Sequence, residues 1–348
     1  MNIYIKGAGV ISAAGNNSDP SFLAEAPGYD THRLNAKEPD YTAYIQPMQL
    51  RRMSKAVRMG IGASKIAGQQ AGIEKPDALS IGTAMGCLQD TEVFLSKMID
   101  QQEQMLTPTA FIQSTHNTVG GQIALLAGCY GHNLTYVHRG HSFEHAIINA
   151  QLYLHAHPHH QMLVGGIDEL VDSSVKVLTA TGVYREGNST EGILHTAGKG
   201  SIAGEGAGFF IASAQPAPGA LRIKGLQIFT TKDAALVSEK MNGFLAQQQL
   251  QQDDIDLLIS GWNGDSRTKP VYDVLHQQFS ASVIAGFKHL SGEYATASSF
   301  GLAMAAHIAG TGMVPGFCRL GSAPARPIRN IILFNNYMHY FSMWHICT

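Results

Sequence analysis

Short apolar runs alternate along the chain with longer segments in which small and apolar residues recur at every third or fourth position. Runs of the first kind are typical of buried strands, and segments of the second kind are typical of helices. In the first half this pattern predicts strands at 2–11, 78–86, 134–137, 161–166 and 209–213, and helices at 54–72, 90–104, 119–128 and 142–156.

The second half repeats this alternation after a Pro-rich turn at 214–219. It predicts strands at 221–225, 255–261, 281–287 and 328–334, the last clear strand, with helices at 234–252 and 296–310. Alternating strands and helices favour a parallel or mixed sheet in each half. We therefore expect an α/β protein with two similar halves, 1–213 and 214–348.

The composition supports a large buried core that is partly covered by a partner. Hydrophobic residues make up 45% of the chain and charged residues 14%, where a soluble domain has about 25% charged residues. Surfaces that face water are usually rich in charge, so a low charge content indicates a covered surface. The net charge of −2 provides no basic field for nucleic acid or a membrane, and we expect neither as a partner.

Cysteine usage and apolar tracts point to a cytoplasmic protein without a metal site. The four cysteines are scattered and form no CxxC pair, which excludes a disulfide framework and a zinc motif of that spacing. Residues 1–15 lack the pattern of a signal peptide. The longest apolar tract, 300–317, contains His307 and Pro315 and is expected to be a buried helix rather than a membrane span. A histidine-rich tract at 155–160 is expected to lie on the surface.

Several short motifs occur one after another along the chain. They are Arg51-Arg52-Met53-Ser54, Thr107-Pro108, Gly120-Gly121-Gln122-Ile123-Ala124, Gly204-Glu205-Gly206-Ala207-Gly208 and Lys288-His289-Leu290-Ser291-Gly292. In this order and spacing the chain resembles the β-ketoacyl-acyl-carrier-protein synthases of the thiolase fold. The resemblance implies two duplicated α/β halves in five layers (αβαβα) and, for Glu205, a structural role.

In that family a cysteine at a helix N-terminus accepts the acyl group, and two histidines support decarboxylation of a malonyl thioester. At the matching positions this chain has Gly140 for the cysteine and Asn263 and Glu293 for the histidines, and only Lys288 is retained. The glycine-rich loop of the family is replaced by 334–341, which contains no glycine. Ordinary condensation is therefore not expected.

These replacements resemble a chain-length factor, the inactive partner of an active ketosynthase in type II polyketide, aryl-polyene or fatty-acid-like biosynthesis. The expected partners are that ketosynthase, in a heterodimer, and an acyl-carrier protein. No cofactor is implied, apart from the carrier's acyl-phosphopantetheine as a ligand. Arg51, Arg52, Lys55 and Arg58 form a basic helical face that either is solvated or docks the acidic carrier.

Two alternatives stay open at this point. Ser142 or His141 could replace the cysteine in an active acyltransferase or synthase variant, although a serine before a helix is first of all an N-cap. The chain could also be a homodimer that binds acyl chains without chemistry.

The resemblance also predicts a geometry. Gly140, Asn263 and Glu293 should converge, and Glu293 should pair with Lys288 or a nearby histidine because an isolated buried carboxylate is costly. The helix that begins near Ser142 should bury its face of Ile147, Ala150 and Leu154.

Overall fold

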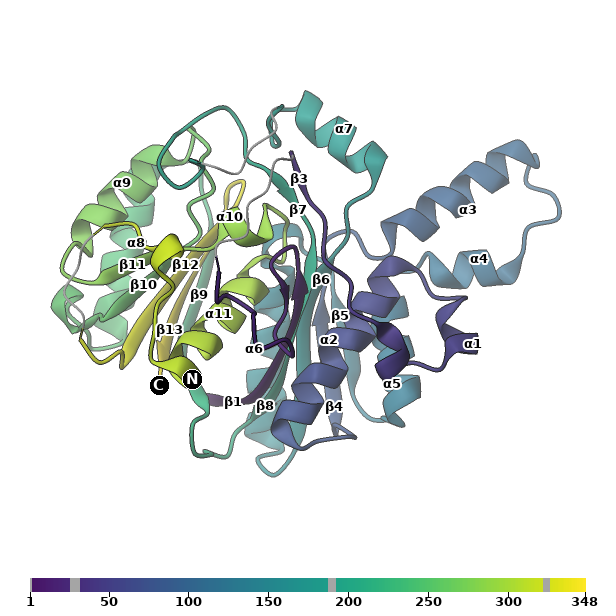
Figure 1. Cartoon of the computed structure of the whole chain (residues 1–348), viewed down its shortest axis with the longest axis horizontal. Coiled ribbons are helices and arrows are strands. Elements are labelled where there is room, and N and C mark those ends of the chain that lie inside the picture. Colours follow the sequence, from purple (N-terminus) through teal and green to yellow (C-terminus); the bar gives the residue numbers. More distant parts are fainter. Residues whose placement is uncertain (1, 26–31, 187–191, 322–325) are drawn as a thin grey trace.

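The computed structural model describes residues 2–25, 32–186, 192–321 and 326–348. Within these ranges one eleven-stranded sheet has the order β11-β10-β12-β13-β9-β1-β8-β6-β4-β5, with β2 paired to β1, and a second sheet pairs β3 with β7. Figure 1 shows the large sheet with α6 and α11 near the centre of the molecule and the other helices on the outside.

The strands are β1 (Ile3–Ser12), β2 (Gly15–Asn16), β3 (Arg33–Leu34), β4 (Ala78–Gly82), β5 (Asn133–Tyr136), β6 (Gln161–Asp168), β7 (Ala203–Gly204), β8 (Gly206–Ser213), β9 (Leu221–Thr230), β10 (Leu257–Ser260), β11 (Val283–Gly286), β12 (Asn330–Tyr337) and β13 (Tyr340–Cys347). The α-helices are α1 (Pro47–Leu50), α2 (Lys55–Ala71), α3 (Leu88–Asp100), α4 (Pro108–Gln113), α5 (Thr118–Ala127), α6 (Ser142–Ala156), α7 (Asp172–Ala180), α8 (Ala234–Gln247), α9 (Lys269–Gln278), α10 (Lys288–Ser291) and α11 (Ser298–Thr311).

The two halves have the same topology. The first contributes the strand order β1-β8-β6-β4-β5 and the second β9-β13-β12-β10-β11. In each half two antiparallel pairings are followed by two parallel pairings, which confirms the mixed sheets. The halves join where β1 pairs with β9 at Ile3–Ile5. The limit at 213/214 lies between β8 and β9, and as a boundary between folding units it stays a prediction.

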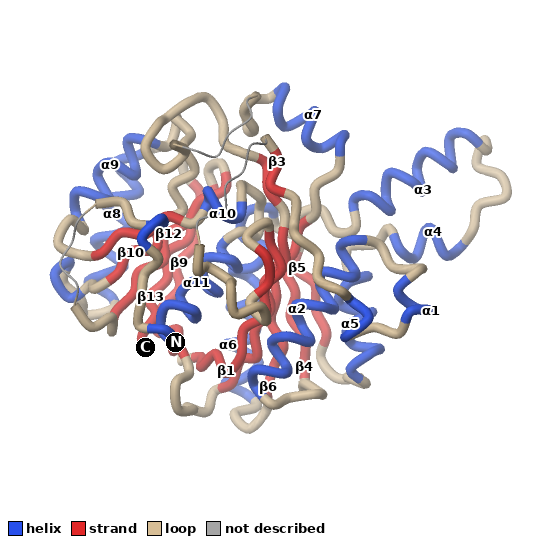
Figure 2. The backbone as a smooth tube through the Cα atoms, in the orientation of Figure 1, coloured by secondary structure: helices blue, strands red, loops and turns tan. Residues whose placement is uncertain are grey.

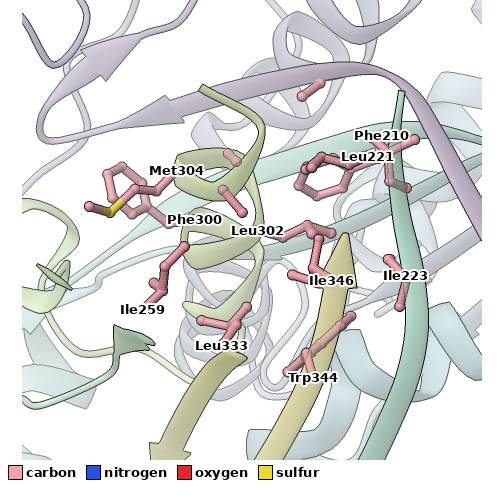
Figure 3. Close-up of a cluster of buried hydrophobic side chains, with 14 of the residues drawn as sticks. Phe210, Leu221, Ile223, Ile259, Phe300, Leu302, Met304, Leu333, Trp344 and Ile346 are labelled. Carbon is pink, nitrogen blue, oxygen red and sulfur yellow. The ribbon is translucent and has the colours of Figure 1, made fainter. Parts of the chain in front are cut away.

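The three largest apolar cores lie between the layers. One lies between α2 and α5 and the first half of the sheet, and another between α8 and α9 and the second half. The third contains side chains of α6, α11 and strands of both halves. In Figure 3, Phe300, Leu302 and Met304 of α11 lie among residues of β8, β9, β10, β12 and β13. The αβαβα fold class is confirmed.

Helix α6 occupies the central layer, as expected. Ile147, Ala150 and Leu154 are each fully buried, and α6 packs against β4 and β6. Its partner in that layer, α11, lies beside β1, β8 and β12 (Figure 2). The apolar tract that contains α11 ends its helix at Gly312, which has a φ of 70° and the left-handed conformation of a C-terminal stop.

Three expectations about elements are wrong. A further strand, β13, follows β12. It was not expected because the turn at Met338 and His339 lacks the glycine that usually marks a hairpin. Helix α9 was missed, and β9 extends well past Gly225 to Thr230. Among the described residues, no helix is both long and apolar enough to cross a membrane.

Candidate functional site

Asn263, Lys288 and Glu293 form a buried cluster at one end of the second half-sheet. Strands β10 and β11 are parallel and in register at Ser260 and Gly286, so the segments that follow them begin side by side. Asn263 Nδ2 donates a hydrogen bond to Glu293 Oε2 at 2.8 Å. Lys288 Nζ lies 3.2 Å from the same oxygen, and both side chains of this ion pair are buried. The predicted pairing of Glu293 with Lys288 is confirmed.

A second buried carboxyl belongs to the same network. Glu144, in the first turn of α6, accepts a hydrogen bond from Ser342 Oγ at 2.9 Å. Burial raises the pKa of Glu144 to about 7, although the hydroxyls of Ser298 and Ser342 and the charge of Lys288 oppose the shift. Burial also raises the pKa of Glu293 and lowers that of Lys288, while the charges in the pair act in the opposite direction. The buried cation of Lys288 therefore pairs with Glu293 and also acts through its charge on Glu144.

Gly140 lies in the turn before α6 and has no room for a side chain. A Cβ atom at this position would lie 2.8 Å from the Cβ of Tyr340 and 2.9 Å from the Cβ of Tyr337. Both tyrosines belong to the β12–β13 hairpin, at the place of the family's glycine-rich loop. Because Cβ atoms cannot swing away without moving the backbone, this contact excludes a cysteine or serine in the present arrangement.

Tyr337 connects Gly140 with the buried cluster. Burial raises the pKa of its phenol, and the charges of Glu293 and Arg139 act on the same group in opposite directions. Arg139 directly precedes Gly140 and has a φ of 49°, so Tyr337 is within electrostatic range of both sides of the site. Asn263 and Lys288 thus each contact Glu293, whereas Gly140 contacts the hairpin.

Two cavities flank this hairpin. The Asn263 cavity, about 470 Å³, is lined by Asn263 and Glu293 and by the polar groups of Lys232 and Arg267. The Arg139 cavity, about 450 Å³, is more apolar and includes Arg139 and Tyr337 in its wall. Met338, at the tip of the hairpin, lines both cavities.

The two substitute nucleophiles are engaged in backbone hydrogen bonds. Ser142 Oγ accepts from the His138 backbone N–H and donates to the Arg139 carbonyl, each at 2.8 Å. The N-cap of α6 is His141 and Ser142 is the first helical residue, so the N-cap expectation was wrong by one position. The His141 ring donates to the Phe341 carbonyl at 3.0 Å, and burial lowers its pKa to about 4. None of these three hydrogen bonds joins the Ser142 hydroxyl to a histidine ring.

Other histidines pair with one another near the surface. His138 Nδ1 and His145 Nε2 lie 2.8 Å apart, and His157 stacks on His160 at the end of α6. In the described ranges no group of three or more His, Cys, Asp or Glu side chains is arranged to hold a metal ion.

Only part of the predicted basic face is open. Lys55 forms an ion pair with the buried Glu205, and Arg58 pairs with Glu38 at 3.1 Å. Glu205 also accepts the backbone N–H groups of Ala36 and Leu170, which fits a structural role. Two of the four charges, those of Lys55 and Arg58, are thus engaged within the chain, whereas Arg51 and Arg52 are exposed. Docking of a carrier on this face stays a prediction.

Comparison with known proteins gives one family match. The sequence model of the β-ketoacyl synthase N-terminal domain matches residues 25–181. The chain resembles the β-ketoacyl synthases. The matched segment is less than half of the chain, and no curated protein sequence matches.

Solved structures extend the likeness of the β-ketoacyl synthase fold to the whole chain. The ishigamide ketosynthase/chain length factor is 15% identical with a TM-score of 0.78, covering 100% of this chain and 99% of that one. A ketosynthase in complex with its chain length factor from Xenorhabdus doucetiae is 16% identical with a TM-score of 0.77, covering 100% and 98%. A type II polyketide acyl-carrier protein in complex with its hexaketide-bound ketosynthase is 13% identical with a TM-score of 0.75, covering 100% and 99%.

Against the β-ketoacyl synthase pattern, sequence reasoning missed Glu144, Tyr337 and Tyr340. Glu144 reads in the sequence as an ordinary acidic residue in the first turn of a helix. The two tyrosines were visible within 334–341, where only the missing glycines were noted. Their three-residue spacing across a tight hairpin was the available signal that both could face one neighbour.

Proposed function

We propose that this protein is a non-condensing ketosynthase-like subunit, of the chain-length-factor type, which pairs with an active β-ketoacyl synthase. The observation that carries the proposal is the packing of Gly140 against the Cβ atoms of Tyr337 and Tyr340. A condensing enzyme must hold its acyl group on a nucleophile at this position. Here the side chain is absent and the space for one is filled.

The sheet edge supports a paired state. Strand β5 is the last strand of its half, and exposed apolar side chains surround it. They are Leu125 of α5, Tyr130, Leu134, Val137 and Leu152 of α6. An unpaired edge strand with apolar neighbours favours pairing with another chain.

A projecting arm offers further contact surface. In Figure 1, α3 and α4 extend away from the body on the same side as β5. The arm exposes Ile99, Met105, Phe111 and Ile112, which are between 57% and 92% accessible. Apolar exposure of this extent is unusual on a monomer, and the proposed ketosynthase would cover it.

The carrier protein would deliver its acyl-phosphopantetheine to the pair. The Asn263 cavity has the polar lining, with Lys232 and Arg267, that suits a pantetheine amide chain and its phosphate. Arg51 and Arg52 would contribute positive charge to carrier docking. The four cysteines are free thiols, which agrees with the proposed location in the cytoplasm.

No geometric feature favours the alternative acyltransferase. Ser142 donates its hydroxyl hydrogen to a carbonyl, and His141 is engaged with Phe341. A serine nucleophile needs a base that accepts this hydrogen.

Covalent loading tests the proposal. The complex with a cysteine-bearing β-ketoacyl synthase is incubated with an acyl-carrier thioester, and the intact mass of each chain is measured. We expect the acyl mass on the synthase and none on this chain. An adduct on this chain that disappears in Ser142→Ala, and persists in the exposed-serine control Ser96→Ala, would establish the alternative instead.

A further inference from the structure

Three side-chain donor atoms meet near the end of β13, away from the site described above. The Cys347 thiol sulfur lies 3.4 Å from His345 Nε2, and that nitrogen lies 3.2 Å from Asn330 Oδ1. The third side of the triangle, from Cys347 Sγ to Asn330 Oδ1, is 3.5 Å. The strand register explains this closeness, because Asn330 pairs with Cys347 and His345 is two residues away on the same face.

The contacts behind two of these donors orient them toward a common point. His345 Nδ1 faces Gln248 Oε1 at 3.3 Å. In the tautomer that donates the Nδ1 proton to this oxygen, the lone pair of Nε2 is directed into the triangle. Asn330 Nδ2 donates to the Asp254 carbonyl at 3.1 Å, which turns the amide oxygen to the same point. Metal-binding histidines are usually held in this way by a hydrogen bond from their second nitrogen.

In that tautomer two lone pairs, on His345 Nε2 and Asn330 Oδ1, face each other at 3.2 Å. Such a contact is repulsive unless a hydrogen or a cation lies between them, and the Cys347 thiol has only one hydrogen to share.

We propose that Cys347, His345 and Asn330 bind a divalent cation of the zinc class. A tetrahedral zinc ion, with ligand bonds of about 2.0–2.3 Å, holds its ligand atoms about 3.4–3.6 Å apart, close to the triangle observed here. Binding forms a bond from the metal to sulfur and breaks the S–H bond, whose proton passes to the buffer. Cys347 is half-buried, which leaves an approach from solvent.

The surroundings define the fourth ligand position. Strand β9 pairs with β13, and its Arg222 lies opposite Cys347, with Lys224 two residues further along the strand. With one thiolate, a divalent ion keeps one positive charge, and two nearby cations would oppose it. The fourth ligand is therefore an anion from solution, and affinity should increase with chloride. This site is independent of the proposed pairing function.

Titration of the full chain with Cd²⁺ tests the site. We expect an ultraviolet thiolate-to-metal absorption band that saturates at one ion per chain, with release of one proton, and that falls to background in Cys347→Ser. The control Cys129→Ser, at a buried thiol elsewhere, should keep the band. A chain without the band, or with a band that survives Cys347→Ser, would overturn the proposal.

A second measurement on the unaltered chain avoids any folding defect of a variant. Alkylation of Cys347 by iodoacetamide, mapped by peptide mass, should slow at least tenfold when Zn²⁺ is added and recover with a chelator. Histidines of the 155–160 tract can bind zinc on the surface, but they cannot protect this thiol. Equal alkylation with and without Zn²⁺ would contradict the site.

Discussion

Within the described residues, the chain covers the edge of the large sheet at β11, whereas β5 pairs only with β4 and has no such cover. Leu320 N–H donates to the Ile284 carbonyl at 2.8 Å, and Arg319 forms an antiparallel bridge with Ala285. Around β5 the neighbouring positions are apolar and exposed. Since the two halves have the same topology, this difference cannot come from the fold. In the proposed pair, the first half and not the second would face the ketosynthase.

The interior differs between the halves in a related way. The second half supplies Lys288 and Asn263, which both contact Glu293 Oε2. The first half supplies Gly140, which carries no functional group, and Glu144, which depends on Ser342 and Lys288 of the second half. The scaffold of the pocket is thus maintained while its nucleophile position is filled by the neighbouring hairpin.

A matched pair of valines tests the two ends directly. Val137, next to β5, is 49% exposed, and Val274 of α9, in the second half, is 48% exposed. Val137→Arg should abolish pairing with the ketosynthase, because a charge would be buried in an apolar contact, whereas Val274→Arg should leave it intact. Size-exclusion chromatography of the co-expressed chains measures this. Equal behaviour of the two variants would remove the distinction between the edges.

The ion pair of the second half should carry the next largest effect. Lys288→Met leaves Glu293 buried without its cation and should lower the unfolding free energy by about 3–5 kcal/mol. Adding Glu293→Gln removes the unpaired charge and should recover most of this loss. Chemical denaturation of the two variants measures the difference. If Lys288→Met were as stable as the unaltered chain, the ion pair would not contribute to stability.

Glu144 should make stability depend on pH. Its folded pKa of about 7 lies above the ordinary value of 4.5, so the folded chain binds the proton more tightly and loses stability as pH rises through this window. In Glu144→Gln this loss is absent. The variant should gain up to about 3 kcal/mol relative to the unaltered chain between pH 4 and pH 8, estimated from the pKa difference. The exposed control Glu239→Gln should show no such trend in denaturation at the same pH values.

Glycine substitutions compare the filled position with an open one. Gly140→Ala should destabilise the chain by about 1–3 kcal/mol because its Cβ meets two tyrosine Cβ atoms. Gly121 in α5 has nothing within 4 Å of its Cβ position, and Gly121→Ala should be neutral or stabilising by up to about 1 kcal/mol. Thermal unfolding separates the two. If Gly140→Ala were neutral, a side chain would fit at this position and the two tyrosines would not fill it.

Sequence patterns predicted the fold well where elements are regular. Helix α6 begins and ends as the periodicity indicates, and β1 and α2 differ from their predicted ranges by a residue or two. The hairpin to β13 was invisible because Met338 adopts a φ of 55° without being glycine.

The site was less predictable because its contacts join distant parts of the chain. Lys55 reads as one charge of a basic face, but it is paired with Glu205, which is 150 positions away. The buried Glu144 accepts a hydrogen bond from Ser342, 198 positions away. Replacement of the family residues could be read from aligned motifs, whereas the closure of Gly140 by Tyr337 and Tyr340 required coordinates.

The most direct test of a non-condensing, paired subunit is the native mass of the assembly formed on co-expression with a cysteine-bearing β-ketoacyl synthase. We expect a one-to-one complex of the two chains. A homodimer of this chain that excludes the synthase would contradict the pairing.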